Sequence, residues 1–268
     1  MDHLRVEPGK RVHLNRLDPS DTGKYKDEEA ARARLLRVVG KLAALQDVLY
    51  AEHKRAVLII LQGMDTAGKD GTIKHVMSAV NPNGCEVAPF KVPTDEEAAH
   101  DFLWRAHRWA PRAGHIAIFN RSHYEDVLVP RVHCTLPRDA VKRRYAQINA
   151  FEKLLVENGT VVLKFFLHIS KQEQRQRLIE RRDDPTKQWK FSLGDLEERK
   201  LWSDYMDAYE ELLSRCSTKE APWYIVPSDH KWYRNLVVAE VLVEALRELG
   251  CEYPAPPLPP ARLRRIRI

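Results

Sequence analysis

An apolar run that passes straight into a glycine-rich turn and then into a helical pattern restricts the fold of this chain most. Residues 56–62, AVLIILQ, are almost entirely apolar and end at Gly63. A short apolar run before a turn is typical of a strand buried on both faces of a parallel sheet. Residues 69–80 then have the spacing of a helix. The stretch predicts a strand–loop–helix unit of an α/β protein.

Strand and helix patterns alternate along the rest of the chain, which is typical of a parallel sheet with helices on both faces. We therefore expect one three-layer α/β/α domain with a five-stranded parallel sheet, over residues 26–250. We find neither an internal repeat nor a dividing linker. The expected strands are residues 56–62, 85–92, 115–119, 160–169 and 223–227, and the expected helices are residues 26–52, 69–80, 98–109, 137–159, 171–182 and 232–249.

Several helix ends are marked in the sequence. Thr94 and Glu97 have the spacing of a capping box, and Ser170 and Glu173 repeat it. Pro137 is expected to begin the long helix that Gly159 ends.

The two ends of the chain differ from its middle. Residues 1–25 are polar and contain proline and glycine, so we expect an extended arm rather than a core element. Residues 251–268 are proline-rich and then basic. We expect this tail either to lie extended along the surface or to dock on a partner subunit.

Composition restricts the class of protein less than the motifs do. Of 268 residues, 44 are Lys or Arg and 38 are Asp or Glu, which leaves a net charge of +6. This modest excess suits a polyanionic partner such as a nucleotide, polyphosphate or nucleic acid. We find no apolar run near the ~18 residues of a membrane span and no apolar core of a signal peptide. The four cysteines have no metal-ligand spacing, so we expect reduced thiols in a cytoplasmic protein: Cys85, Cys134, Cys216 and Cys251.

The glycine-rich turn nearly matches a phosphate-binding P-loop. The pattern G-x-x-x-x-G-K-[ST] is met by Gly63, Gly68 and Lys69 and fails at Asp70. Backbone N–H groups at such a turn point at an anion, and the lysine adds positive charge. The alternative is a glycine-rich turn with a solvated lysine. The predicted phosphate-binding set is Gly63, Ala67, Gly68, Lys69, Asp70, Gly71 and Thr72.

Two carboxylates distinguish this loop from a simple ATP site. A carboxylate facing phosphate is repulsive unless a cation lies between them, so Asp65 is a candidate for holding Mg²⁺ or orienting an acceptor phosphate. For Asp70 we favour a position in the first turn of the helix, where the helix dipole stabilises negative charge.

A second cluster of polar residues follows the predicted strand 115–119. Because ligands bind beyond the carboxyl ends of parallel strands, this turn and the glycine loop are expected to converge. Arg121 can neutralise the moving phosphoryl group, and Asp126 can bind Mg²⁺. The alternative is that Arg121 and Asp126 form a structural ion pair. Asn120 and Glu125 are further candidates for contacting a nucleotide.

Basic residues gather again in a segment of about residues 175–197, which we expect to be a mobile lid over phosphates. The alternative is an ordinary charged helix with a loop. The predicted phosphate-binding members are Arg177, Arg181, Arg182, Lys187 and Lys190, with Arg181 the candidate for catalysis.

Four stretches together resemble the polyphosphate kinase 2 family: GMDTAGKDGTIK, FNRSHYEDVL, FFLHISKQEQRQRLIERRDDPTKQWKFSLGDLEER and APWYIVPSDHKWYRNL. The resemblance covers roughly residues 30–250 and implies a thymidylate-kinase-like P-loop kinase fold with a helical lid. It also implies reversible phosphoryl transfer from inorganic polyphosphate to nucleotides with Mg²⁺, or alternatively Mn²⁺. On this resemblance Asp65 and Asp126 hold the metal, Lys69 binds phosphate, and Asn120 and Arg121 contact nucleotide and phosphate.

The Asp-Gly pair after Lys69 resembles the subgroup that phosphorylates both AMP and ADP. The expected partners are therefore polyphosphate, nucleoside mono- and diphosphates, and further copies of the chain in a dimer or tetramer, without nucleic acid or membrane. An ATP-dependent nucleoside monophosphate kinase and a non-catalytic polyanion-binding module remain alternatives.

Overall fold

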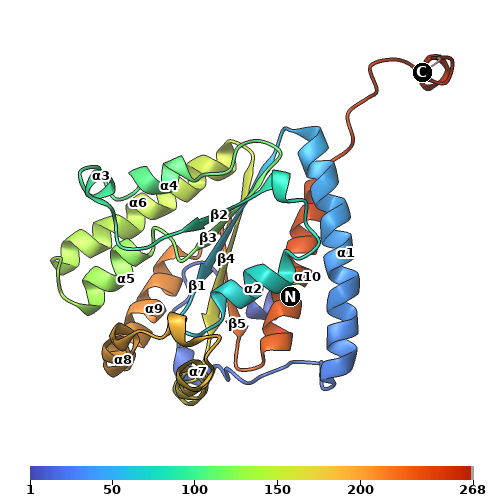
Figure 1. Ribbon diagram of the computed structural model, residues 1–268. Helices are drawn as coiled ribbons and strands as arrows, with labels where there is room; N and C mark the ends of the chain where they lie inside the picture. Colours follow the sequence, from blue (N-terminus) through green and yellow to red (C-terminus); the bar gives the residue numbers. More distant parts are fainter. Residues whose placement is uncertain (267–268) are drawn as a thin grey trace.

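A computed structural model describes residues 1–266 of the protein and shows one five-stranded sheet (Figure 1). The strand order is β2-β3-β1-β4-β5, and every neighbouring pair is parallel, as expected. Ile59 in the central strand lies opposite Ile118 on one side and Leu163 on the other. The strands are β1 (Ala56–Gln62), β2 (Cys85–Pro89), β3 (Ile116–Asn120), β4 (Thr160–His168) and β5 (Trp223–Pro227).

Helices cover both faces of this sheet, which confirms the expected three layers (Figure 1). All of β1 is buried, because helices cover both faces of the sheet at this strand (Figure 1). A strand covered on both faces needs apolar side chains on both, which explains its apolar sequence. One layer holds α1 (Glu28–Glu52), α2 (Lys69–Val76) and α10 (Lys231–Leu249). The other holds α3 (Asp95–Ala98), α4 (Trp104–Arg108), α5 (Glu125–Val132), α6 (Arg138–Glu157) and α9 (Trp202–Cys216). Beyond the carboxyl ends of the strands lie α7 (Lys171–Asp183), η4 (Gln188–Lys190) and α8 (Leu193–Lys200).

The marked helix ends are found with two exceptions. Pro137 precedes α6 as expected, and Ser170 accepts a hydrogen bond from the amide of Glu173 at the start of α7. The Glu173 side chain does not complete this cap, because it binds Arg177 one turn later. The second exception is α2, which ends at Val76 instead of continuing to residue 80.

The expected helix 98–109 was wrong. The capping box of Thr94 and Glu97 is present, but α3 stops after a single turn. The carboxylate of Asp101 then accepts the amide of Leu103, and α4 begins separately at Trp104. A short Asp side chain competes in this way with the helical hydrogen bonds of the backbone.

Apart from a short helix in the C-terminal tail, three α-helices within residues 1–266 were not expected: α5, α8 and α9. Pro130 inside α5 argues against a helix on sequence grounds, since proline removes a backbone donor. The sequence does carry the signal for α9, because its buried residues recur at helical spacing. They are Tyr205, Ala208, Tyr209, Leu212, Leu213 and Cys216.

The N-terminal arm takes part in the core, contrary to expectation. Val6, Val12 and Leu14 are buried. The amide of Val12 donates to Ser214 Oγ (2.9 Å) and the amide of Leu14 donates to Glu210 (2.7 Å), both on α9. A polar segment is thus fixed by a few apolar residues and by its backbone donors.

The C-terminal tail leaves the body of the molecule (Figure 1). One of our two expectations was that it lies extended along the surface, and that expectation was wrong. Its residues 252–266 are exposed, including the short helix α11 (Pro260–Leu263). Docking on a partner subunit stays a prediction. The last two residues, 267–268, lie outside the described part. Within residues 1–266 no helix has the length and apolar character that a membrane crossing needs.

Candidate active site

The loop between β1 and α2 packs so closely that it requires glycine at two positions. A Cβ on Gly63 would lie 2.8 Å from the backbone oxygen of Leu167, and one on Gly68 would lie 1.9 Å from Arg234. Gly68 also has a φ of +105°, a conformation that side chains disfavour. The amides of Ala67 and Thr72 already donate to Met64 (3.1 Å) and Gly68 (2.8 Å) carbonyls. The amides between them, 68–71, are therefore the ones left for phosphate.

Lys69 lies at the start of α2 with its side chain folded back over the loop. Its Nζ donates to the carbonyls of Gly63 (2.7 Å) and Met64 (3.2 Å). Burial, together with the charge of Arg121, lowers the pKa of Lys69 to about 8. The ammonium is therefore mostly charged at neutral pH and has lost much of its hydration, which strengthens its attraction for an anion.

The turn after β3 meets the glycine loop directly, as expected. Arg121 adopts a left-handed backbone (φ 62°), and its amide donates to Leu61 O (3.1 Å) at the end of β1. Its guanidinium donates to Asp65 (2.5 Å) and lies 3.4 Å from Glu125. The alternative of an Arg121–Asp126 ion pair was wrong, because the carboxylates that bind Arg121 are Asp65 and Glu125.

Asp126 has a different arginine partner. Oδ2 of Asp126 accepts a hydrogen bond from the buried Arg105 (2.8 Å), and its backbone oxygen accepts one from Arg144 (2.6 Å). Arg105 was not among the predicted site residues. Arg105 lies in a helix outside both motifs, so nothing in the sequence marks it as a site residue.

Asp70 connects three parts of the site instead of facing phosphate alone. Its Oδ1 accepts from Asn120 (2.8 Å) at the end of β3, and its Oδ2 accepts from Lys190 (2.9 Å) in the lid segment. Asp70 is in the first turn of α2, as the helix-dipole interpretation requires. The side chain is 62% exposed, so the link to Lys190 is open to solvent.

Two cavities meet at Asp65 and Arg121. We call the first the basic chamber: it has a volume of about 680 Å³ and is lined mainly by the loop, α2 and the lid segment. We call the second the aromatic chamber: it has a volume of about 590 Å³ and lies toward α5 and α9. The basic chamber includes Gly68, Lys69, Arg181, Lys187, Lys190 and Lys231. The aromatic chamber includes Phe90, Arg105, Glu125, Asp126, Tyr205 and Tyr209.

The predicted lid residues divide into two groups. Arg181, Lys187 and Lys190 line the basic chamber, with Arg181 3.4 Å from Asp195 of α8. Arg182 lines neither chamber and pairs with its neighbour Asp183 at the surface (2.6 Å). The structure therefore does not bring Arg182 into the site.

Arg177 also lines the basic chamber, but its hydrogen bonds go mainly to backbone carbonyls of the loop. It donates to the carbonyls of Thr66 (2.9 Å), Ala67 (3.2 Å) and Ser228 (2.7 Å), and only 5% of the residue is exposed. These contacts support a role of Arg177 in holding the loop in place. They give less support to the direct contact with phosphate that was predicted from the sequence. Arg234 of α10 also donates to Ala67 O (2.9 Å), and nothing in the sequence singled it out.

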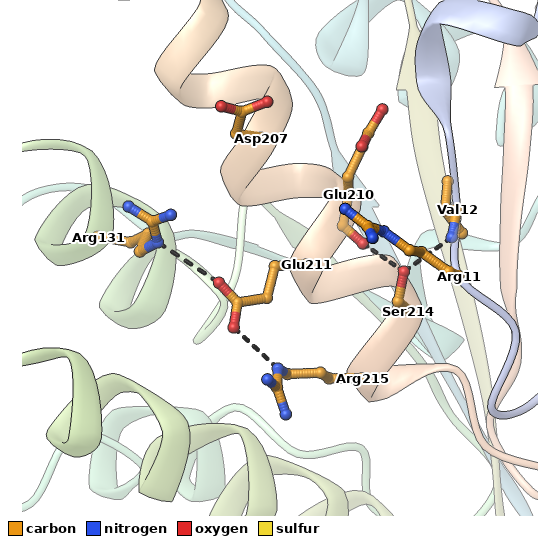
Figure 2. A pocket seen from close by; sticks show the side chains of 8 residues that line it. All are labelled: Arg11, Val12, Arg131, Asp207, Glu210, Glu211, Ser214 and Arg215. Carbon is orange, nitrogen blue, oxygen red and sulfur yellow. Dashed lines mark hydrogen bonds and ion pairs between the residues drawn. The ribbon is translucent and has the colours of Figure 1, made fainter.

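A third cavity, of about 480 Å³, lies between the N-terminal arm, α5 and α9, and shares no lining residue with the two chambers (Figure 2). Its carboxylate Glu211 binds Arg215 (2.8 Å) and lies 3.4 Å from Arg131 (Figure 2). Its whole lining has three arginines and three carboxylates, so its charges balance and we do not include this cavity in the site.

Comparison with known proteins identifies the family and the fold. A family model described as Polyphosphate kinase 2 (PPK2) matches residues 25–252. The chain belongs to the polyphosphate kinase 2 family. A relative from Meiothermus ruber named AMP/ADP-polyphosphate phosphotransferase is 51% identical over 257 residues, which are 96% of each chain. An ADP-polyphosphate phosphotransferase from Rhodopseudomonas palustris is 46% identical over 94% of this chain and 91% of its own.

A solved structure agrees with this polyphosphate kinase 2 assignment along nearly the whole chain. The crystal structure of polyphosphate kinase 2 from Arthrobacter aurescens TC1 superposes with a TM-score of 0.94 at 45% identity. The match covers 98% of this chain and 94% of the other. The expected P-loop kinase fold is thereby confirmed.

Proposed function

We propose that this chain transfers phosphoryl groups reversibly from inorganic polyphosphate to nucleoside mono- and diphosphates, AMP to ADP and ADP to ATP. The observation that carries the proposal is the meeting of two unlike chambers at the Asp65–Arg121 pair. Transfer requires donor and acceptor phosphates to meet at one point, with cationic groups beside the moving phosphoryl group.

The basic chamber suits the donor. A phosphate chain offers repeated negative charge and has neither base nor ribose to recognise, so positive side chains and backbone amides are the groups that bind it. Lys69, Arg181 and Lys190 line this chamber together with the open amides of the loop. The lid segment supplies Arg181 and Lys190, which we propose close over the chain.

The aromatic chamber suits the acceptor nucleotide. Phe90, Tyr205 and Tyr209 offer the flat apolar surfaces against which a base can lie. Arg105 and Arg121 line the same chamber and can bind the acceptor phosphate. Most of these residues are buried or paired within the fold, so the pocket is largely preformed.

Asp65 and Asp126 fit a magnesium ion. Each binds an arginine through one carboxylate oxygen, Oδ1 of Asp65 and Oδ2 of Asp126, and both residues line the aromatic chamber. No cluster of three or more potential ligands occurs among residues 1–266. Mg²⁺ does not need one, since it commonly uses one or two carboxylates together with water and substrate phosphates. Bound Mg²⁺ would offset phosphate charge, and Mn²⁺ is the alternative ion.

The chain's own groups then perform positioning and charge neutralisation. Lys69 holds the donor phosphate against the loop, while Arg121 offsets charge that develops on the transferring group. Asp65 orients Arg121 through their 2.5 Å contact. No covalent intermediate with the protein is required.

A coupled assay tests the proposal. Purified protein is supplied with AMP, ADP, GMP or GDP, and with polyphosphate as the sole donor. We expect ADP and ATP to be formed from AMP. Product formed only with ATP as donor would favour the ATP-dependent nucleoside monophosphate kinase. Salt-sensitive polyanion binding without any turnover would favour the binding module.

We also propose, from the family resemblance, that the protein is a cytoplasmic dimer or tetramer that binds no nucleic acid. Light scattering on the purified chain measures the number of subunits. A monomer at all concentrations would contradict the proposed dimer or tetramer.

A further inference from the structure

Arg234 is a buried arginine directly beneath the phosphate-binding loop. It lies in the first turn of α10, and only 2% of the residue is exposed. Nη1 donates to Ala67 O (2.9 Å), while Nε and Nη2 donate to Oδ1 of Asn235 (3.2 and 2.9 Å). Its side-chain partners in the described chain are thus a carbonyl and a neutral amide, and no carboxylate pairs with it.

The contact with Ala67 sets the direction of the next amide. In a trans peptide unit the C=O and N–H bonds point to opposite sides. Because the Ala67 carbonyl points inward to Arg234 and Arg177, the N–H of Gly68 points the other way. Gly68 lines the basic chamber, and no acceptor within residues 1–266 takes its N–H.

Arg234 is also a poorly compensated charge. Burial, together with the charge of Arg177, lowers the pKa of Arg234 to about 9, so it is still protonated at neutral pH. Arg177 differs because it has a carboxylate partner, Glu173, at 2.8 Å. A buried charge without a counter-charge is unfavourable, and an anion on the other side of the loop would relieve it.

We propose that Arg234 is a positioning residue for the phosphate donor. It holds the Ala67–Gly68 peptide with its N–H directed into the basic chamber. Its positive charge also lies beneath the loop without a carboxylate partner from the protein. Bound phosphate then supplies the negative charge that balances it. This inference rests on the proposed function, and it agrees with glycine at residue 68, where a Cβ would overlap the guanidinium of Arg234 and where the φ of +105° already disfavours a side chain.

Asn235→Asp is the decisive variant because it keeps the shape of the acceptor and supplies the missing counter-charge. We expect the KM for polyphosphate to rise about tenfold, with the KM for AMP changed less than twofold. We also expect the melting temperature to rise without polyphosphate and the shift induced by tripolyphosphate to shrink. Asn83→Asp, at an exposed position in the turn before β2, is the matched control and should leave all four values unchanged.

Arg234→Met and Arg234→Lys give an independent test. We expect the methionine variant to lose polyphosphate affinity about tenfold or more, and the lysine variant to recover part of it. If either fails to fold, Asn235→Asp still decides the matter. An unchanged or lower KM for polyphosphate in Asn235→Asp, with the wild type active, would overturn this inference. A wild type inactive with polyphosphate would instead overturn the proposed function.

Discussion

The guanidinium of Arg121 binds the carboxylate of Asp65 at 2.5 Å, across 56 positions of the chain. The pair joins the loop after β1 to the turn after β3, two strands that lie side by side. It also stands where the basic and aromatic chambers meet. A charge-assisted contact of this length fixes both side chains before substrate binds, which lowers the cost of reorganisation during transfer.

Replacing Asp65 with Asn should reduce kcat by about 100-fold or more, because the amide neither pairs with Arg121 as strongly nor binds Mg²⁺ well. Lys69→Ala should cause a loss of similar size, since it removes the ammonium over the loop. Asp139→Asn is the control, as Asp139 is an exposed carboxylate on α6. Turnover and thermal unfolding are measured together. Wild-type rates in either site variant, with the fold intact, would refute these assignments.

The pKa of Lys69 predicts an alkaline limit on donor binding. Because this pKa is lowered to about 8, Lys69 is charged below pH 8 and loses its proton as the pH rises through that value. We therefore expect kcat/KM for polyphosphate, which reports the free enzyme, to fall above pH 8.

The measurement is a rate profile from about pH 6.5 to 9.5 at constant ionic strength. Lys69→Arg provides the control, because arginine keeps its charge over this range. If kcat/KM of this variant falls above pH 8 in the same way, a group other than Lys69 is responsible.

Asp126→Asn should raise the Mg²⁺ concentration needed for half-maximal rate by about tenfold or more. The amide can still accept from Arg105, so the wall of the chamber is preserved. Glu198→Gln is the matched control, since Glu198 lines the same chamber without a proposed ligand role. A changed maximal rate with an unchanged Mg²⁺ dependence in Asp126→Asn would remove Asp126 from the metal site.

Behind the Arg121 turn, Lys164 and Glu152 form a fully buried ion pair at 2.5 Å. Lys164 also donates to Tyr124 (3.0 Å) and to the Cys216 carbonyl (2.6 Å). Lys164→Met should lower the free energy of unfolding by roughly 3–5 kcal/mol, because the buried Glu152 would lose its lysine counter-charge and keep Tyr124 as its hydrogen-bond donor. Urea denaturation gives the value.

The double variant Lys164→Met/Glu152→Gln should recover part of this loss, since no buried charge remains. Lys153→Met, at an exposed pair on α6, should change stability by less than about 1 kcal/mol. Equal losses in the single and double Lys164 variants would contradict the explanation.

The sequence predicted four of the five strands well because they are short apolar runs that need burial on both faces, whereas the mostly exposed edge strand β2 ends at Pro89 and not at residue 92. Residues 56–62 and 223–227 match β1 and β5 in full. It predicted the 95–108 region poorly, because there the Asp101 side chain competes with the helix through a local contact. The helix α5 was missed since Pro130 is an unfavourable signal that tertiary packing outweighs.

The sequence predicted several residues of the candidate site, but it did not predict which of them pair with one another. Asp65, Lys69 and Arg121 stand in motifs with a recognisable pattern, and all three line the site. Arg105 and Arg234 lie in ordinary helical sequence, and only their distance to Asp126 and to Ala67 reveals a role. Pattern carries information about neighbours along the chain, whereas these contacts join distant segments.

By itself, therefore, the sequence determined the parallel α/β architecture, the glycine loop and the family, because hydrophobic periodicity and local motifs act over a few residues. Only the tertiary structure decided which carboxylate binds which arginine, where Arg182 points, and that Arg234 lies uncompensated under the loop. The reason is physical: ion pairing and burial depend on distances that close only when the strands, the lid and α10 pack together.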